Sequence, residues 1–518
     1  MRRVGSLLPN RASVKGGTLG TRTSAGFLWL LANGLSSKVI QMGSQLVLAW
    51  LLVPADFGLV GLAYTVTAFT SVLEQGGVRD VLVQRQRHLH GWVNPAFWIA
   101  LTTGLLSAGC IVGLAPVAAM IYGRNELTGM LLIMALASPL TSLQNVTKAL
   151  LQIDLRFEVV AATGIMQSVG QAALSIFFAW RGFGAFSFVL PRPILAAATL
   201  GVQWWLTRPK IRRNPEFKLW KYLFTDTVKV FAAALVLTIT AQGDYIVLGL
   251  TQPAAVVGLY FFAFNLSMQS VALLGINLSG VLFPALSKLQ HDKTKQAKAY
   301  LKAVQAMVII GLPAAMLQFL LAAPLIRLLY ERHWHPAIPV LEILSIGMMF
   351  RLVGTTAGSL LSAQGRFGLR FLLSCLYAVL FVVLVSAASL VGGLVQVALA
   401  VAVYYALVGI IHPRIVIAHA GLGWTPIFRL FVPGIIAGGA AVLVALIAGS
   451  GLPVTRIGDV GRAAVRLFTF CGLYFVLIRM LAPAAVTEFQ TRIRSLLSSF
   501  LPRAGRAIAA SGAQRPRA

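Results

Sequence analysis

The sequence predicts an all-α polytopic membrane protein, and three observations support this. The 518 residues are 58% hydrophobic and only 11% charged, whereas a soluble protein needs roughly a quarter of its residues charged to cover its surface. The apolar residues come in blocks of about 20 or more, the length at which a helix crosses a ~30 Å hydrocarbon core. The period-2 alternation typical of a membrane β-barrel is absent, so helices must satisfy the backbone inside lipid.

About fourteen spans are predicted by this length rule. Their centres lie near Val39, Ala68, Leu105, Ser138, Ser168, Leu195, Leu235, Gln269, Ile309, Met349, Val379, Val401, Gly438 and Gly472. If the N-terminus is cytoplasmic, the inside segments carry 32 of the 43 Lys and Arg residues, and the outside loops carry six: Arg124, Arg181, Arg327, Arg332, Arg456 and Arg462. The positive-inside rule therefore predicts an inner-membrane protein with both termini in the cytoplasm.

The net charge of +29 has the same explanation. Basic residues lie between apolar blocks, where they face anionic lipid headgroups, which favours membrane lipids over nucleic acid as partners. The basic stretch 1–23 lacks the apolar core of a signal peptide and is predicted to be a cytoplasmic tail. The three cysteines lie within apolar stretches and predict neither a disulfide framework nor a metal site.

The chain also repeats itself. Pro54-Ala55-Asp56-Phe57-Gly58-Leu59 resembles the stretch from Pro253 to Gly258-Leu259 about 200 residues later. We expect a six-helix lobe at 24–206, a second at 207–425, two extra helices at 426–482 and a basic cytoplasmic tail at 483–518. Two such lobes, entering the membrane from the same side, would be related by an axis along the membrane normal, with a cavity between them.

Polar residues within spans are costly and so are candidates for function. Gly34, Lys38, Gln41 and Gln45 are spaced to form one stripe on a helix, which predicts a cavity wall or polar packing between helices. Arg192 lies between Pro191 and Pro193, which predicts a kink or break in the sixth span. Its guanidinium could meet an anionic headgroup or cap freed carbonyls.

Six more charges lie in predicted spans. Arg351 is deep and is a candidate cavity cation. Asp226 and Lys229 are three residues apart, so they form either a charge site or a neutralised structural pair. Asp244 and Glu342 are candidates, with Asp226, for binding a coupling cation. Arg466 lies near a span end and is predicted to snorkel to the interface.

Other motifs carry no chemistry of their own. The pairs His88/His90 and His333/His335 lack Cys or carboxylate partners in a metal-binding pattern, and Trp334 is predicted to be an interfacial anchor. No phosphate-binding loop, dinucleotide loop or nucleophile elbow is present in the sequence. We therefore expect no catalytic residues, no metal and no resident cofactor.

Several motifs together resemble the Wzx-type oligosaccharide flippases, in the polysaccharide transporter family of the multidrug/oligosaccharidyl-lipid/polysaccharide exporter superfamily. They run in order through about Ser24 to Gly421: the stretch beginning at Pro54, Asn94-Pro95-Ala96-Phe97-Trp98, Gly243-Asp244-Tyr245, Val281-Leu282-Phe283-Pro284, and Trp334-His335-Pro336-Ala337. One departure is the charged stretch Glu74–Asp80.

The resemblance implies a transporter, not an enzyme. It would move polyprenyl-diphosphate-linked oligosaccharide units from the cytoplasmic to the periplasmic leaflet by alternating access, for exopolysaccharide or lipopolysaccharide synthesis. Coupling to H+ or Na+ is possible, and polymerase and glycosyltransferases of the same pathway are candidate partners. Two alternatives remain: a cation-coupled multidrug exporter on the same fold, and a membrane polysaccharide polymerase or ligase.

Overall fold

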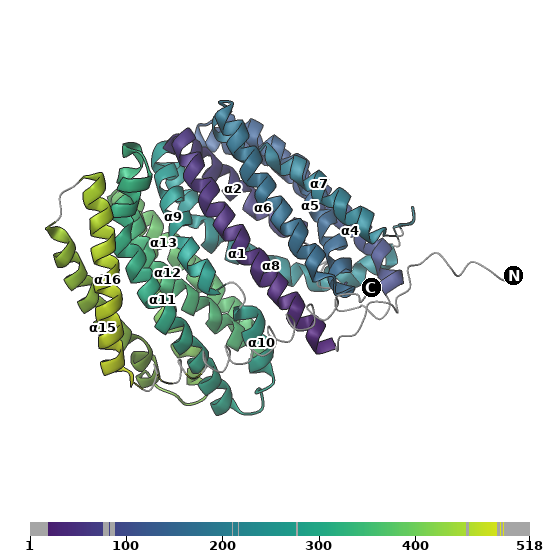
Figure 1. Ribbon diagram of the computed structural model, residues 1–518. Coiled ribbons are helices and arrows are strands. Elements are labelled where there is room, and N and C mark those ends of the chain that lie inside the picture. The colour runs from purple at the N-terminus through teal and green to yellow at the C-terminus, as the bar shows by residue number, and fades with distance from the viewer. Residues whose placement is uncertain are drawn as a thin grey trace, which may run out of the picture. The chain divides into compact units, whose positions relative to one another are not determined.

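The computed structural model describes residues 19–75, 82, 89–209, 211–215, 217–275, 278–451, 455–483, 487 and 491. Helices make up almost all of this part, and it contains no strand (Figure 1). Twelve of its helices are long and apolar enough to cross a membrane. All fourteen predicted span centres lie inside long helices, the two beyond those twelve being α1 and α9. The all-α polytopic fold is thus confirmed.

The described residues form two compact units. The first takes in the chain up to Leu51 together with Ala63–Leu235, and the second takes in Leu52–Leu62 and the chain from Val236 onward. Helices α2 (Pro54–Gln75) and α8 (Phe217–Thr251) therefore have residues in both. The predicted lobe limits stay a prediction, as does the cavity between the lobes.

The first unit is built from pairs of packed helices. Helix α4 packs along α5, α5 packs along α7, and α6 packs against α1. Gly104 allows α4 to approach α5 closely, because a Cβ at this position would lie only 2.8 Å from the Pro139 Cα of α5. The elements of this unit outside α2 and α8 are α1 (Leu19–Leu51), α4 (Leu89–Tyr122), α5 (Glu126–Ile153), α6 (Phe157–Trp180), the 3-10 turn η2 (Gly184–Phe188) and α7 (Pro191–Thr207).

The Asn94–Trp98 motif holds the loop that follows α7. The Asn94 amide donates to the Asn214 carbonyl at 2.7 Å and accepts from the Arg212 N–H at 2.9 Å. The Trp98 indole donates to the Arg212 carbonyl at 2.9 Å. Two side chains from one turn of α4 thus satisfy backbone groups of the segment that joins the two sequence repeats.

The second unit centres on α12, whose side chains are mostly buried. Helices α9, α11 and α14 pack against it, and α15 and α16 lie side by side next to α11 (Figure 1). Its elements are α9 (Ala254–Gly275), α10 (Leu278–Ser287), α11 (Lys293–Leu329), the 3-10 turn η3 (Arg332–Ala337), α12 (Ile338–Ala363), α13 (Phe367–Val391), α14 (Leu394–Ala418), α15 (Thr425–Ser450) and α16 (Arg456–Leu481). Helices α15 and α16 lie where the sequence predicts the two extra spans.

The repeated motifs touch each other in this unit. A Cβ placed on Gly58 of α2 would overlap the Ala254 carbonyl, and one on Gly258 of α9 would overlap the Pro54 carbonyl. Only glycine permits this reciprocal backbone contact, the kind of small-residue approach that brings helices together in membranes. Equivalent positions of the two sequence repeats therefore form one helix crossing.

Trp334 does not anchor the protein at the interface. Its side chain is fully buried, with ring centroids 4.9 Å from Phe57 and 4.4 Å from Phe262. Trp334 lies in the short turn η3, directly before α12. The packing of the three aromatic rings outweighs the interfacial preference of indole. The motif around Trp334 thus contributes to the core beside the α2–α9 crossing.

Candidate functional site

The polar stripe on α1 has two environments. The Lys38 ammonium is half-buried and donates to the Gln41 amide oxygen at 3.2 Å, and Gln41 is exposed. Gln45 is buried, and its Nε2 makes no hydrogen bond. About two turns before Gln45, Ser37 accepts a hydrogen bond from the Ser168 hydroxyl of α6 at 2.8 Å. Helix α1 therefore packs against α6 through small polar groups, while Lys38 and Gln41 form a separate pair.

Arg192 lies in the first turn of α7, directly after the change from the 3-10 turn η2 to the α-helix, so the spanning segment has a break here and no kink in mid-helix. Pro191 begins the helix, since proline is tolerated in the first turn, where its missing N–H would have no partner. The preceding turn η2 and α7 together form one apolar segment, Gly184–Thr207, long enough to cross a membrane. The Arg192 guanidinium carbon lies 4.2 Å from the centre of the Tyr64 ring of α2. This cation–π contact fixes a charge inside a spanning segment.

Glu74, which begins the charged stretch Glu74–Asp80, lies at the centre of a polar cluster in the first unit. Its carboxylate accepts from the Ser107 hydroxyl at 3.1 Å, and its carbonyl, in the last turn of α2, accepts from Ser142 and Asn145 at 3.2 and 3.1 Å. It also interacts electrostatically with Arg192. In the sequence, the feature that could have identified Glu74 as a site is its place at the end of an apolar predicted span.

The second unit holds an arginine in a similar setting. The Arg351 guanidinium of α12 lies 5.2 Å from the centre of the Tyr405 ring and 5.7 Å from that of Phe264. Its nearest polar contact is the Met268 sulfur, at 3.2 Å. Among the described residues, neither Arg351 nor Arg192 has a carboxylate within ion-pair distance, so each keeps guanidinium N–H groups for another acceptor.

Asp244 is buried beside this arginine and held by tyrosine. Its carboxylate accepts from the Tyr260 hydroxyl at 2.6 Å and from the Tyr245 backbone N–H at 3.0 Å. Arg351 is among the charges that act on it. The carboxylate is thus satisfied by neutral donors, and its predicted role in binding a coupling ion stays a prediction.

The remaining candidate site residues do not lie with either of these two arginines. Glu342 lies with Arg327 and Arg466 in a polar pocket at another part of α12, away from Arg351. The side chains of Asp226 and Lys229 lie outside the described residues, although the backbone of α8 is described there. In the described part of the chain, no group of three His, Cys, Asp or Glu side chains could hold a metal ion.

Residues 47–339 match the sequence profile of a family described as "Polysaccharide biosynthesis protein". The chain belongs to this family. The matched region covers the Arg192 and Asp244 centres and ends at the start of α12. The family resemblance drawn from the motifs is confirmed.

Individual relatives have low identity. The succinoglycan biosynthesis transport protein ExoT of Rhizobium meliloti is 27% identical over 58% of this chain and 61% of its own length, less than two thirds of it. The lipopolysaccharide biosynthesis protein WzxC of Escherichia coli is 22% identical over 76% of this chain and 80% of its own. The teichuronic acid biosynthesis protein TuaB of Bacillus subtilis is 23% identical over 67% of this chain and 72% of its own length.

Solved structures with the same fold are transporters. The lipid II flippase MurJ, in an inward closed conformation, superposes with a TM-score of 0.70, at 13% identity, over 88% of this chain and 99% of its own. An inward-facing MATE family multidrug resistance transporter gives a TM-score of 0.55 at 15% identity, over 76% of this chain and 95% of its own. At these identities the likeness shows the fold alone.

Proposed function

We propose that this membrane protein is a flippase that moves polyprenyl-diphosphate-linked oligosaccharide units from the cytoplasmic to the periplasmic leaflet, for exopolysaccharide or lipopolysaccharide synthesis. The observation that carries the proposal is that each unit of a polysaccharide-biosynthesis family member holds an arginine inside a spanning helix, against an aromatic ring and with no described carboxylate within ion-pair distance. A membrane protein keeps such charges for a function, because burying an unpaired guanidinium in lipid is costly.

A diphosphate suits these arginines chemically. The planar guanidinium fork donates two parallel hydrogen bonds to phosphate oxygens. Tyr64 and Tyr405 hold the two guanidinium groups through their ring faces, which leaves the edges that carry the N–H groups for the ligand. Lys38 would add a third cation. In a site of low dielectric each charge pair is worth far more than in water.

The multidrug-exporter alternative shares the fold but not the charge pattern. An exporter of organic cations needs carboxylates that its substrate can reach, and the described acid in the aromatic cluster, Asp244, is already bound by Tyr260. A polymerase or ligase would need a substantial external loop to carry its chemistry. The transporter proposal therefore includes no catalytic residue and no resident cofactor, with H+ or Na+ as the candidate driving ion.

The function can be tested in cells depleted of this protein. Lipid-linked repeat units should accumulate and remain inaccessible to an external lectin or glycosidase in spheroplasts, and export of the polymer should stop. Re-expression should restore access. If the units reach the outer face without this protein but remain unpolymerised, the chain is a polymerase instead. If only drug resistance changes, the exporter alternative is correct.

The proposed orientation places both termini in the cytoplasm of a bacterial cell, with the protein in the inner membrane and the pathway's glycosyltransferases and polymerase as candidate partners. Reporter fusions after Lys221 and Lys295 should therefore report cytoplasm, and fusions near Gln252 and His333 should report periplasm, because the Lys and Arg residues alternate between loops. The reverse pattern at either pair would contradict the orientation.

A further inference from the structure

A second polar site lies away from the two arginines of the proposed function. It is a pocket of about 230 Å³ at the ends of α11, α12, α15 and α16, and apolar side chains line the rest of its wall. The charge-based topology places these four helix ends on the outer side of the membrane. Five charged side chains meet there: Arg327, Glu342, Asp459, Arg462 and Arg466.

Arg466 is built into the wall of the pocket. It was predicted to snorkel outward, but its guanidinium turns inward and donates to the Leu320 carbonyl of α11 at 3.0 Å. That carbonyl lacks its helical donor, because Pro324 has no N–H. Gly449 leaves room for the side chain, since a Cβ there would lie 3.0 Å from Nε of Arg466. The Arg466 Nε is buried and makes no hydrogen bond with any described residue.

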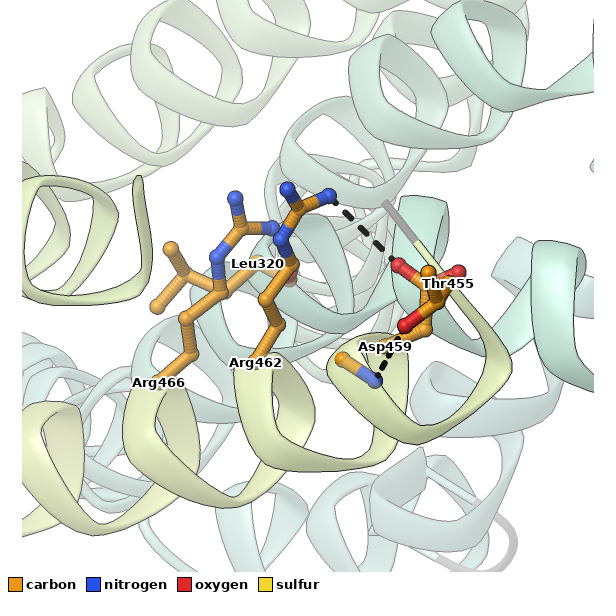
Figure 2. Close-up of polar contacts among 6 residues, drawn as sticks. Leu320, Thr455, Asp459, Arg462 and Arg466 are labelled. Atoms are coloured by element: carbon orange, nitrogen blue, oxygen red, sulfur yellow. Dashed lines mark hydrogen bonds and ion pairs between the residues drawn. The ribbon is translucent and has the colours of Figure 1, made fainter. Parts of the chain in front are cut away.

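Arg462 lies alongside Arg466 on the same face of α16, one turn earlier (Figure 2). It forms an ion pair with Asp459 at 3.5 Å, and both side chains are largely buried, at 12% and 6% exposure. Thr455 caps the start of α16 by accepting from the Gly458 N–H at 3.1 Å. The two guanidinium groups are therefore held side by side by a rigid helix start.

The charges in the pocket do not balance. Three arginines face two carboxylates, and Arg327 makes no hydrogen bond or ion pair in the described part of the chain. Two of the six arginines of the cation-poor outer side, Arg327 and Arg462, are thus concentrated with Arg466 around one cavity, where their mutual repulsion is costly without an anion. The same two helices, α15 and α16, carry exposed apolar side chains such as Leu443, Ile447 and Val460, which suit contact with lipid.

We propose that this pocket binds a phosphate group at the outer face of the protein. Arg327, Arg462 and the free edge of Arg466 donate to its oxygens, and one negative charge completes the balance with Glu342 and Asp459. The phosphate can be carried by a phospholipid headgroup or a polyprenyl phosphate, or can be free in solution, and these sources are separated by the experiment. The site is independent of the diphosphate site of the proposed function and can be tested without transport.

Native mass spectrometry of the purified full-length chain can measure this binding. The probes are phosphatidylglycerol, undecaprenyl phosphate and inorganic phosphate, each compared with a phosphate-free partner: diacylglycerol, undecaprenol and chloride. Arg327→Gln should weaken binding of the preferred probe about tenfold, the loss of one hydrogen bond to a charged group. Glu342→Gln should tighten binding several-fold, because it removes a repelling carboxylate. Binding of inorganic phosphate as tight as that of either lipid would assign the site to the free anion.

The control is Arg181→Gln, which removes another arginine of the predicted outer side, one that lies at the end of α6 against Phe177 and Trp180. It should leave binding unchanged. Equal weakening by Arg181→Gln and Arg327→Gln would reduce the effect to general electrostatics and overturn the proposal. So would a lower melting temperature for Arg327→Gln and Glu342→Gln with wild-type binding of every probe, since the five charges would then be a structural network only.

Discussion

Replacing Arg192 with glutamine should stop most polysaccharide export while leaving the protein folded in the membrane. The change removes a guanidinium that contacts the Tyr64 ring, a contact worth about 0.5–2 kcal/mol, and that also interacts electrostatically with Glu74. If it holds the diphosphate, the loss of charge-assisted hydrogen bonds should slow transport roughly tenfold to a hundredfold. The measurement is polymer export at matched membrane abundance, with lipid-linked units assayed on the cytoplasmic side.

The matched variant is Arg192→Lys, which keeps the charge but loses the planar fork. It should restore export only in part, because a point ammonium cannot make the bidentate contact. Arg351→Gln should show a similar defect, because its guanidinium is held against a ring in the same way in the second unit. Full export by Arg192→Gln at wild-type abundance would contradict the diphosphate role.

Replacing Gly58 with alanine should destabilise the second unit. The added methyl group would overlap the Ala254 carbonyl, and backbone cannot move aside as a flexible side chain can, so we expect a cost of about 1–3 kcal/mol or more. Gly258→Ala should have a similar effect, through the Pro54 carbonyl. The double variant should cost less than the sum, because separating α2 from α9 once relieves both overlaps. Thermal unfolding in detergent and the amount of protein in the membrane fraction measure this.

Gly113→Ala provides the control. Gly113 also lies inside a membrane helix, but a Cβ there would meet no atom within 4 Å. This variant should unfold at the wild-type temperature or higher, because alanine is favoured over glycine in helix interiors by about 1 kcal/mol. If Gly58→Ala unfolds like Gly113→Ala, the close crossing of α2 and α9 is not a constraint on this protein.

The positions of the fourteen long helices could be predicted from the sequence because hydrophobic length is a local property, whereas the ten-residue helix α10 was not expected. The repeat was also visible, but the contact between Gly58 and Gly258 was not, since two equivalent positions need not touch. Trp334 was misassigned because aromatic residues near span ends occur both at interfaces and in cores, and only its neighbours Phe57 and Phe262 decide between these.

The sequence identified the charged residues within the spans, but not the side chains and carbonyls that they contact. Arg192 and Arg351 stand out in apolar spans, but the rings beneath them come from helices distant in sequence. Glu74 was not recognised as a site because it was read as part of a charged stretch, while its partners Ser107 and Ser142 are ordinary residues of other spans. Arg466 bonds to a carbonyl 146 residues away, and no local pattern indicates such a pair.

The hydrogen bond between Arg466 and the Leu320 carbonyl also means that the second unit depends on α16 for its stability. A truncation that ends before α16 would leave that carbonyl without a donor in a membrane-spanning helix, at a cost of several kcal/mol in hydrocarbon. Helices α15 and α16 are thus not a detachable addition to the second unit. A shortened chain would need Pro324→Leu as well, because leucine restores the N–H group that Leu320 lacks.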